Sequence, residues 1–199
     1  MALTTYTAGE VLTAASLNDN LAYAVTVPAS TPSALTLISD ITVTAASTTN
    51  INNCFSATYK NYKVVMNLSA SAAAHLYFRW RVGGTDDTTS NYNTAYYYTL
   101  LTGAGVGNGR SSAAQAHDLQ VSGNMISASV DMTIYQPFES GYTSTTFNNV
   151  NGETSINTPY SFVGATQFLV NTSFDGISIF SGSAVTFTGS IKIYGLQNS

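Results

Sequence analysis

From Leu35 onward, apolar and polar residues alternate with the two-residue period of β-strands that bury one face. Each run ends in Gly, Asn or Ser, residues that favour turns. The pattern predicts an all-β domain, an antiparallel β-sandwich of jelly-roll type with about eight strands. The positions that define these strands are Leu35, Leu37, Ile41 and Val43; Tyr62, Val64, Met66 and Leu68; Leu76, Phe78, Trp80 and Val82; residues 94–101; Ile126, Ala128, Val130, Met132 and Ile134; residues 162–170; Ile177 and Ile179; and Val185, Phe187, Ile191 and Ile193.

A different period marks the N-terminal segment, where residues 13–25 form the one convincing helical pattern. Ser16 and Asp19 have the spacing of a capping box. Because so short a helix is marginal on its own in water, we expect it to dock onto another surface. The residues that share its apolar face are Leu17, Leu21, Ala24 and Val25.

The domain boundary is predicted just after this helix. Residues 27–33 contain Pro28 and Pro32 among small residues, a composition typical of an extended linker. We therefore expect an N-terminal arm over residues 1–33 and a jelly-roll domain over residues 34–199.

Charge is scarce in this chain. Only 8% of its 199 residues are charged, against 44% hydrophobic, and the net charge is −4. The six basic residues are scattered, which argues against binding to a nucleic acid backbone. A surface of uncharged hydroxyl, amide and apolar groups suits a protein that is held in a large assembly.

Nothing in the sequence predicts insertion into a membrane. No segment approaches the ~20 apolar residues of a membrane span, and residues 1–7 lack the basic and apolar regions of a secretory signal. We expect synthesis in the cytosol. The single cysteine, Cys54, excludes an intrachain disulfide and a cysteine-built zinc site, and we expect it to be a small buried hydrophobe.

The residues for catalysis are also sparse. His75 and His117 are the only histidines, and no serine lies in a Gly-x-Ser-x-Gly elbow, so we expect His75 to begin a strand and His117 to lie in a loop. The adjacent Asp86 and Asp87 are better explained as a solvated turn than as a glycosidase pair. We predict that the chain is not an enzyme and uses no cofactor and no metal.

Two long spacers, residues 83–93 and 103–118, exceed what a tight hairpin requires, and such loops carry function or subunit contacts. Gly103, Gly105, Gly107 and Gly109 suggest a phosphate-binding loop only superficially, because the Gly-Lys-Ser/Thr ending and the following helix are missing. We expect a flexible loop there.

Residues 75–82 place Tyr77, Arg79 and Arg81 on the face opposite the apolar positions of their strand. In a monomer this face would be solvated, whereas aromatic and Arg side chains are typical of an interface in an oligomer. Both interpretations stay open, and these three residues are the candidates for a trimer interface.

Tyrosine is concentrated at positions 92 and 96–98. A tyrosine offers a ring that stacks on sugars and a hydroxyl, so a carbohydrate site is conceivable. The favoured interpretation is structural, because three consecutive tyrosines place side chains on both faces of a strand, one set in the core and the other at an interface.

With these residues laid out, the beginning of the chain becomes recognisable. Residues 6–18, Tyr-Thr-Ala-Gly-Glu-Val-Leu-Thr-Ala-Ala-Ser-Leu-Asn, resemble the opening of many bacteriophage tail-fibre, tail-associated and head-surface proteins. In those proteins the leader attaches the module to the virion. The resemblance therefore implies an attachment role for Tyr6, Val11, Leu12, Leu17 and Leu21.

The end of the chain carries a second resemblance. Residues 174–183 and 187–196 look like the last two strands of small jelly-roll domains in phage fibre and decoration proteins, which are generally homotrimers. The resemblance implies a trimeric capsid decoration or cement protein, bound through its arm to the major capsid protein or another virion protein. The outer head surface is favoured over the tail.

An alternative from another class stays open. A short tail-fibre or head-fibre adhesin would bind host-surface glycan through its distal loops, and a glycan depolymerase would in addition need a carboxylate pair. The candidate glycan-contact residues are Asp86, Asp87, Tyr92, Tyr96, Tyr98 and Asp118.

Overall fold

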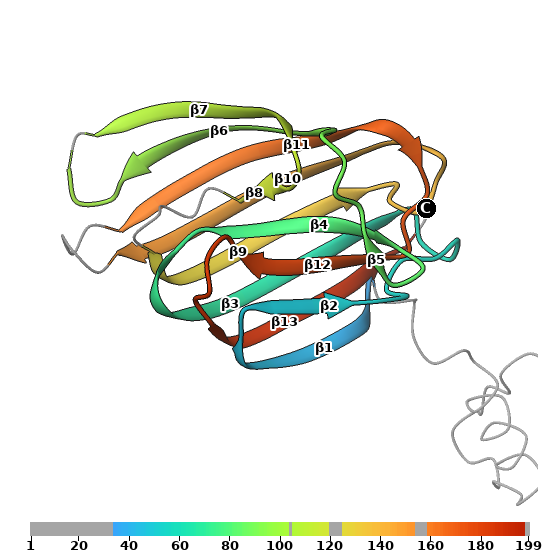
Figure 1. Cartoon of the computed structure of the whole chain (residues 1–199), viewed down its shortest axis with the longest axis horizontal. Coiled ribbons are helices and arrows are strands. Elements are labelled where there is room, and N and C mark those ends of the chain that lie inside the picture. The colour runs from blue at the N-terminus through green and yellow to red at the C-terminus, as the bar shows by residue number, and fades with distance from the viewer. Residues whose placement is uncertain (1–33, 104, 120–124, 154–158, 198–199) are drawn as a thin grey trace, which may run out of the picture. The chain divides into compact units, whose positions relative to one another are not determined.

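The computed structural model describes residues 34–103, 105–119, 125–153 and 159–197 (Figure 1). The expected arm, its helix and its linker lie outside the described residues. So do the candidate attachment residues Tyr6, Val11, Leu12, Leu17 and Leu21. The predictions made for residues 1–33 therefore stay predictions.

The described residues form β-strands and no helix, and every pair of neighbouring strands is antiparallel. This confirms the predicted all-β antiparallel class. The strands are β1 (Leu35–Ala46), β2 (Thr48–Ile51), β3 (Asn61–Ala74), β4 (Leu76–Val82), β5 (Thr85–Asp86), β6 (Tyr92–Leu100), β7 (Val106–Ala114), β8 (His117–Asp118), β9 (Met125–Tyr135), β10 (Gly141–Glu153), β11 (Tyr160–Thr172), β12 (Gly176–Ser181) and β13 (Phe187–Leu196).

The strands are arranged in two sheets. The large sheet has eight strands in the order β1-β13-β3-β9-β10-β11-β6-β7, and the small sheet has the order β2-β12-β4-β5, with β8 also paired to β4. Figure 1 shows β4, β12 and β2 as a layer in front of β3, β13 and β9. Both sheets contribute to one buried core, an arrangement consistent with a β-sandwich.

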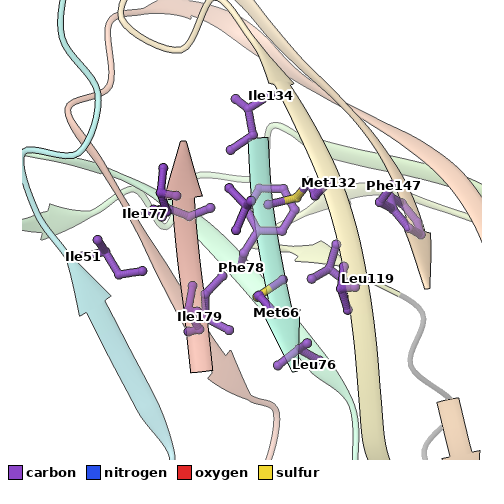
Figure 2. Close-up of a cluster of buried hydrophobic side chains, with 14 of the residues drawn as sticks. Ile51, Met66, Leu76, Phe78, Leu119, Met132, Ile134, Phe147, Ile177 and Ile179 are labelled. Atoms are coloured by element: carbon purple, nitrogen blue, oxygen red, sulfur yellow. The ribbon is translucent and has the colours of Figure 1, made fainter. Parts of the chain in front are cut away.

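The core is built from the inward positions of both sheets. In Figure 2, Met66 and Met132 of the large sheet lie close to Phe78 and Ile179 of the small sheet. Trp80 stacks on Phe174 with ring centroids 5.4 Å apart. Each large side chain that is buried in this way stabilises the fold by roughly 1.5–3 kcal/mol.

The glycine-rich segment is not the flexible loop that we expected. It leads into β7, an edge strand of the large sheet, and its glycines alternate along the strand direction. A Cβ at Gly107 would collide with the Tyr98 ring, and one at Gly109 with the Tyr96 ring. At Gly107 and Gly109 the absence of a Cβ therefore leaves room for the ends of the Tyr98 and Tyr96 side chains.

Candidate functional site

The outer face of the small sheet carries a continuous stack of rings. Tyr77 of β4 lies opposite Phe180 of β12, and their ring centroids are 5.7 Å apart at 25°. His75 stacks on the other side of Tyr77 at 5.8 Å. The Arg79 guanidinium lies over the Phe180 ring, 4.5 Å from its centroid, which is the geometry of a cation–π contact.

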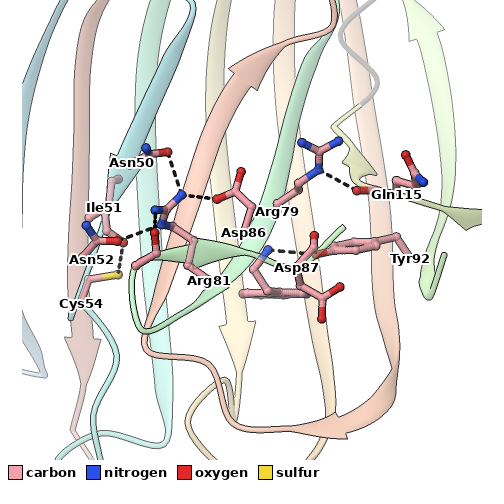
Figure 3. Close-up of polar contacts among 12 residues, drawn as sticks. Asn50, Ile51, Asn52, Cys54, Arg79, Arg81, Asp86, Asp87, Tyr92 and Gln115 are labelled. Atoms are coloured by element: carbon pink, nitrogen blue, oxygen red, sulfur yellow. Dashed lines mark hydrogen bonds and ion pairs between the residues drawn. The ribbon is translucent and has the colours of Figure 1, made fainter. Parts of the chain in front are cut away.

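Arg79 connects this stack to the short segment between β7 and β8. Its Nε donates to the carbonyl of Gln115 at 2.8 Å (Figure 3). A groove of about 460 Å³ follows, lined among others by Tyr77, Arg79, Asp118 and Phe180. Two of the candidate interface residues and one candidate glycan residue therefore share one groove, although the sequence placed them in separate sites.

The acidic side of the groove interacts with a histidine. A carboxylate oxygen of Asp118 lies 3.6 Å from Nδ1 of His75. The nearby Asp118 carboxylate raises the pKa of His75, against the opposing effect of its partial burial. The groove thus combines an aromatic wall with groups of both charges, which suits contact with a polar partner or ligand.

Arg81 does not belong to this exposed surface, which corrects its predicted place in a trimer interface. Its side chain is buried and forms an ion pair with Asp86. The guanidinium also donates to Oδ1 of Asn52 at 2.8 Å, to Oδ1 of Asn50 at 2.9 Å and to the carbonyl of Gly84 (Figure 3). These four acceptors engage four of the five guanidinium N–H groups, and the side chain is only 6% exposed, so little of it is open to a partner chain.

The acidic spacer after β4 is a structural turn. Oδ1 of Asp87 accepts a hydrogen bond from the backbone N–H of Thr89 at 2.8 Å, which confirms the expected turn at this residue. Its neighbour Asp86 is instead the ion-pair partner of Arg81. Neither carboxylate faces the groove at Asp118, so the predicted glycan residues do not form one site.

Tyr92 is also corrected, because it is a core residue rather than a glycan contact. Its ring is fully buried. The hydroxyl donates to the carbonyl of Asp87 at 2.8 Å and accepts from the backbone N–H of Trp80 at 3.2 Å (Figure 3). Tyr92 therefore fixes the spacer between β4 and β6 and has no surface for a ligand.

The three consecutive tyrosines of β6 divide between two faces, as the sequence predicted. Tyr96 and Tyr98 pack against Phe162 with ring centroids 6.0 and 5.5 Å away, and both are partly buried. Tyr97 points to the opposite face and is 72% exposed. The glycan hypothesis selected Tyr96 and Tyr98 for their place in the cluster, whereas alternation along the strand singles out Tyr97 as the exposed ring.

Two reactive side chains lie in the core. Burial raises the pKa of the Cys54 thiol to about 12, so the predicted role as a buried hydrophobe is confirmed. His117 lies in β8 rather than in a loop, and burial lowers its pKa to about 3. Its ring is enclosed by Phe78 and Tyr92, each with a centroid 4.7 Å away.

Within the described ranges, no three His, Cys, Asp or Glu side chains lie close enough together to hold a metal ion. In the same part of the chain, no helix is present that could cross a membrane. No protein-family model matches the sequence, and no curated protein matches it either.

Proposed function

We propose that this chain is a structural protein of a bacteriophage particle, a trimeric decoration or cement protein on the outer surface of the head. In this proposal residues 1–33 attach it to the major capsid protein or another virion protein. One observation carries the proposal. The segments that resemble phage decoration and fibre domains form β12 and β13, which are inner strands of the two sheets and pair on both sides.

The strand pairing supports a jelly roll as the finer description of the fold. A jelly roll is a long hairpin folded over, in which the first strand pairs with the last and so on inward. Eight strands fit this scheme through the pairs β1–β13, β2–β12, β3–β9 and β4–β5. Strands β10, β11, β6 and β7 then extend one sheet beyond the basic fold.

The stack on the small sheet supports the trimer. Tyr77, Phe180 and Arg79 present aromatic and guanidinium surface on one face of β4 and β12. Such side chains are enriched where protein surfaces meet. A chain with few charges also has little electrostatic repulsion to oppose association of its copies.

We also propose that the chain is not an enzyme. His117 is neutral in the core at physiological pH, since its pKa is lowered to about 3. Asp86 is held by Arg81 and Asp87 closes a turn. These groups make structural contacts in place of the acid–base pairing that hydrolysis needs.

A short fibre adhesin is the second candidate function. The groove at Tyr77, Arg79 and Asp118 favours it, because an aromatic wall with polar groups at its rim is typical of ligand sites. In this alternative the protein lies on a fibre and contacts host-surface glycan.

Immunogold electron microscopy of intact virions tests the choice, with an antibody raised against residues 34–199. Dense labelling over the head is the expected result. Labelling confined to the tail would replace the decoration role with the adhesin. Virions that bind no gold, while the denatured particles react with the antibody on a blot, would contradict both surface locations.

A further inference from the structure

The outer face of β11, β6 and β7, on the large sheet, carries three adjoining hollows. Their volumes are about 460, 570 and 510 Å³. The first two share Tyr97, Val163 and Asn108, and the last two share Arg110. The hollows therefore follow one another along the strands, separated first by Tyr97 and then by Arg110.

Tyr97 offers a stacking surface at the first boundary. The ring is 72% exposed. Val163 and Asn108 are its neighbours on the two adjacent strands and line the same hollows. A tyrosine ring that stands on a rigid strand between two hollows can stack on a sugar ring at little cost in conformational entropy.

Arg110 supplies the only charge in the lining of the three hollows. Within the described part of the chain its guanidinium has no ion-pair partner. Its neighbours across β6 and β11 are Ala95 and Ala165, whose small side chains leave the guanidinium open. Because Arg110 pairs with a residue two positions from Tyr97, the two groups are offset by about 7 Å along the strands.

We propose that this outer face binds a carboxylate-bearing saccharide. Tyr97 stacks on a sugar ring, Arg110 pairs with a carboxylate, and the amide of Asn108 bonds hydroxyl groups. The chain as a whole is acidic, with a net charge of −4, yet these hollows contain one cation and no carboxylate. Charge complementarity therefore selects an anionic ligand, and the planar guanidinium suits a carboxylate in particular. This inference does not rest on where the protein lies on a particle, nor on the groove at Arg79.

Isothermal titration calorimetry of the full chain tests the proposal with two probes. One is an oligosaccharide of glucuronic acid, and the other is a neutral glucose oligosaccharide of the same linkage and length. The unaltered protein is expected to bind the acidic probe about tenfold or more tightly than the neutral one, and less tightly in high salt. Arg110→Gln should remove that preference, Tyr97→Ala should abolish binding of both probes, and Tyr97→Phe should retain it.

Two matched variants serve as controls. Tyr142 of β10 is 57% exposed and lies outside the hollows, so Tyr142→Ala should bind as the unaltered protein does. Lys60→Gln removes a different exposed cation and should keep the acidic preference. Absence of binding to the acidic probe, or full binding by Tyr97→Ala, would overturn the proposal. So would dissociation of an oligomer by Tyr97→Ala in sedimentation, because this face would then be a subunit contact.

Discussion

His117 shows how burial of one side chain makes the stability of the fold depend on pH. Its ring lies among Phe78, Trp80 and Tyr92, and its Nδ1 lies 3.4 Å from the hydroxyl of Thr94. Burial holds its pKa at about 3, well below the value of about 6.5 in an unfolded chain. Between these values the unfolded state binds a proton that the folded state does not, so stability must fall as pH falls.

We predict that acidification from about pH 7.5 to about pH 5 lowers the free energy of unfolding of the unaltered protein. The decrease should be about 2 kcal/mol larger than the decrease in the His117→Gln variant. The variant removes the titrating group and keeps a polar side chain near Thr94. Urea unfolding of both proteins at the two pH values measures the difference.

His75 opposes this effect in both proteins. Its raised pKa adds stability that is complete below about pH 6.5 and is lost as pH rises through the folded value. Because His75 is unchanged in the variant, its contribution cancels from the comparison. Equal acid sensitivity of the two proteins would show that His117 does not titrate as proposed.

At the residue scale, alternation placed many inward positions correctly, but Leu35, Leu37, Val82 and Ile126, which it also placed inward, are exposed. Phe78 and Trp80 are buried as expected, because their burial follows from the strand period alone. Arg81 was placed on the exposed face, yet its side chain is buried. It donates hydrogen bonds to Asn50 and Asn52, about 30 positions earlier in the chain. A pattern within one strand carries no information on partners so distant.

Among the elements, β13 depends on a single glycine. Gly189 has a φ of 149° and is paired with Leu68 of β3 on one side and Val43 of β1 on the other. A Cβ there would collide with the carbonyl oxygen of Asn67, which is backbone and cannot swing away. The strand therefore requires glycine for both conformation and space.

We predict that Gly189→Ala lowers the free energy of unfolding by about 2 kcal/mol or more. Gly141→Ala is the matched control, because a Cβ at Gly141 meets no atom within 4 Å. The Gly141→Ala variant should have almost the same unfolding midpoint as the unaltered protein. Chemical denaturation of the two variants distinguishes them, and equal stability would contradict the close approach of β13 to β3.

Two of the strands that sequence reasoning missed, β7 and β10, share one cause. Strand β10 directs the polar residues Thr143, Thr145 and Asn149 inward, so its sequence lacks the alternating apolar pattern that predicts a strand. In β7, Gly107 and Gly109 make room for Tyr98 and Tyr96. In both strands the buried positions lack the large apolar side chains by which the other strands were found.

For the whole molecule, we propose a trimer on the basis of one of its surfaces. The stack of Tyr77, Phe180 and Arg79 lies on the outer face of the small sheet, and the chain carries few charges to keep copies apart. Arg81 does not take part, because its side chain is buried and is held by contacts within its own chain.

We predict that the full chain sediments as a trimer at micromolar concentration. Combined Tyr77→Ala and Arg79→Ala substitutions should shift it toward monomer, whereas Tyr142→Ala on the other sheet should not. A monomer for the unaltered full chain would contradict the trimer, and a trimer that survives the double substitution would move the interface elsewhere.

At this scale the sequence predicted the class of the fold but not the number and order of the strands in the large sheet. The alternating runs indicated antiparallel strands, and the structure has them. The widening of one sheet by β10, β11, β6 and β7 depends on pairing between segments far apart in the chain. No local pattern reports such pairing.

The inner places of β12 and β13 determine when this domain can fold. Among the described strands these two are the last to leave the ribosome, yet Lys192 of β13 bonds Asp40 of β1, 152 positions earlier. While it is being synthesised, the chain therefore exposes strand edges whose partners do not yet exist. Assembly must wait until translation has passed Leu196, and a chain that stops before Gly176 loses an inner strand of each sheet rather than a dispensable end.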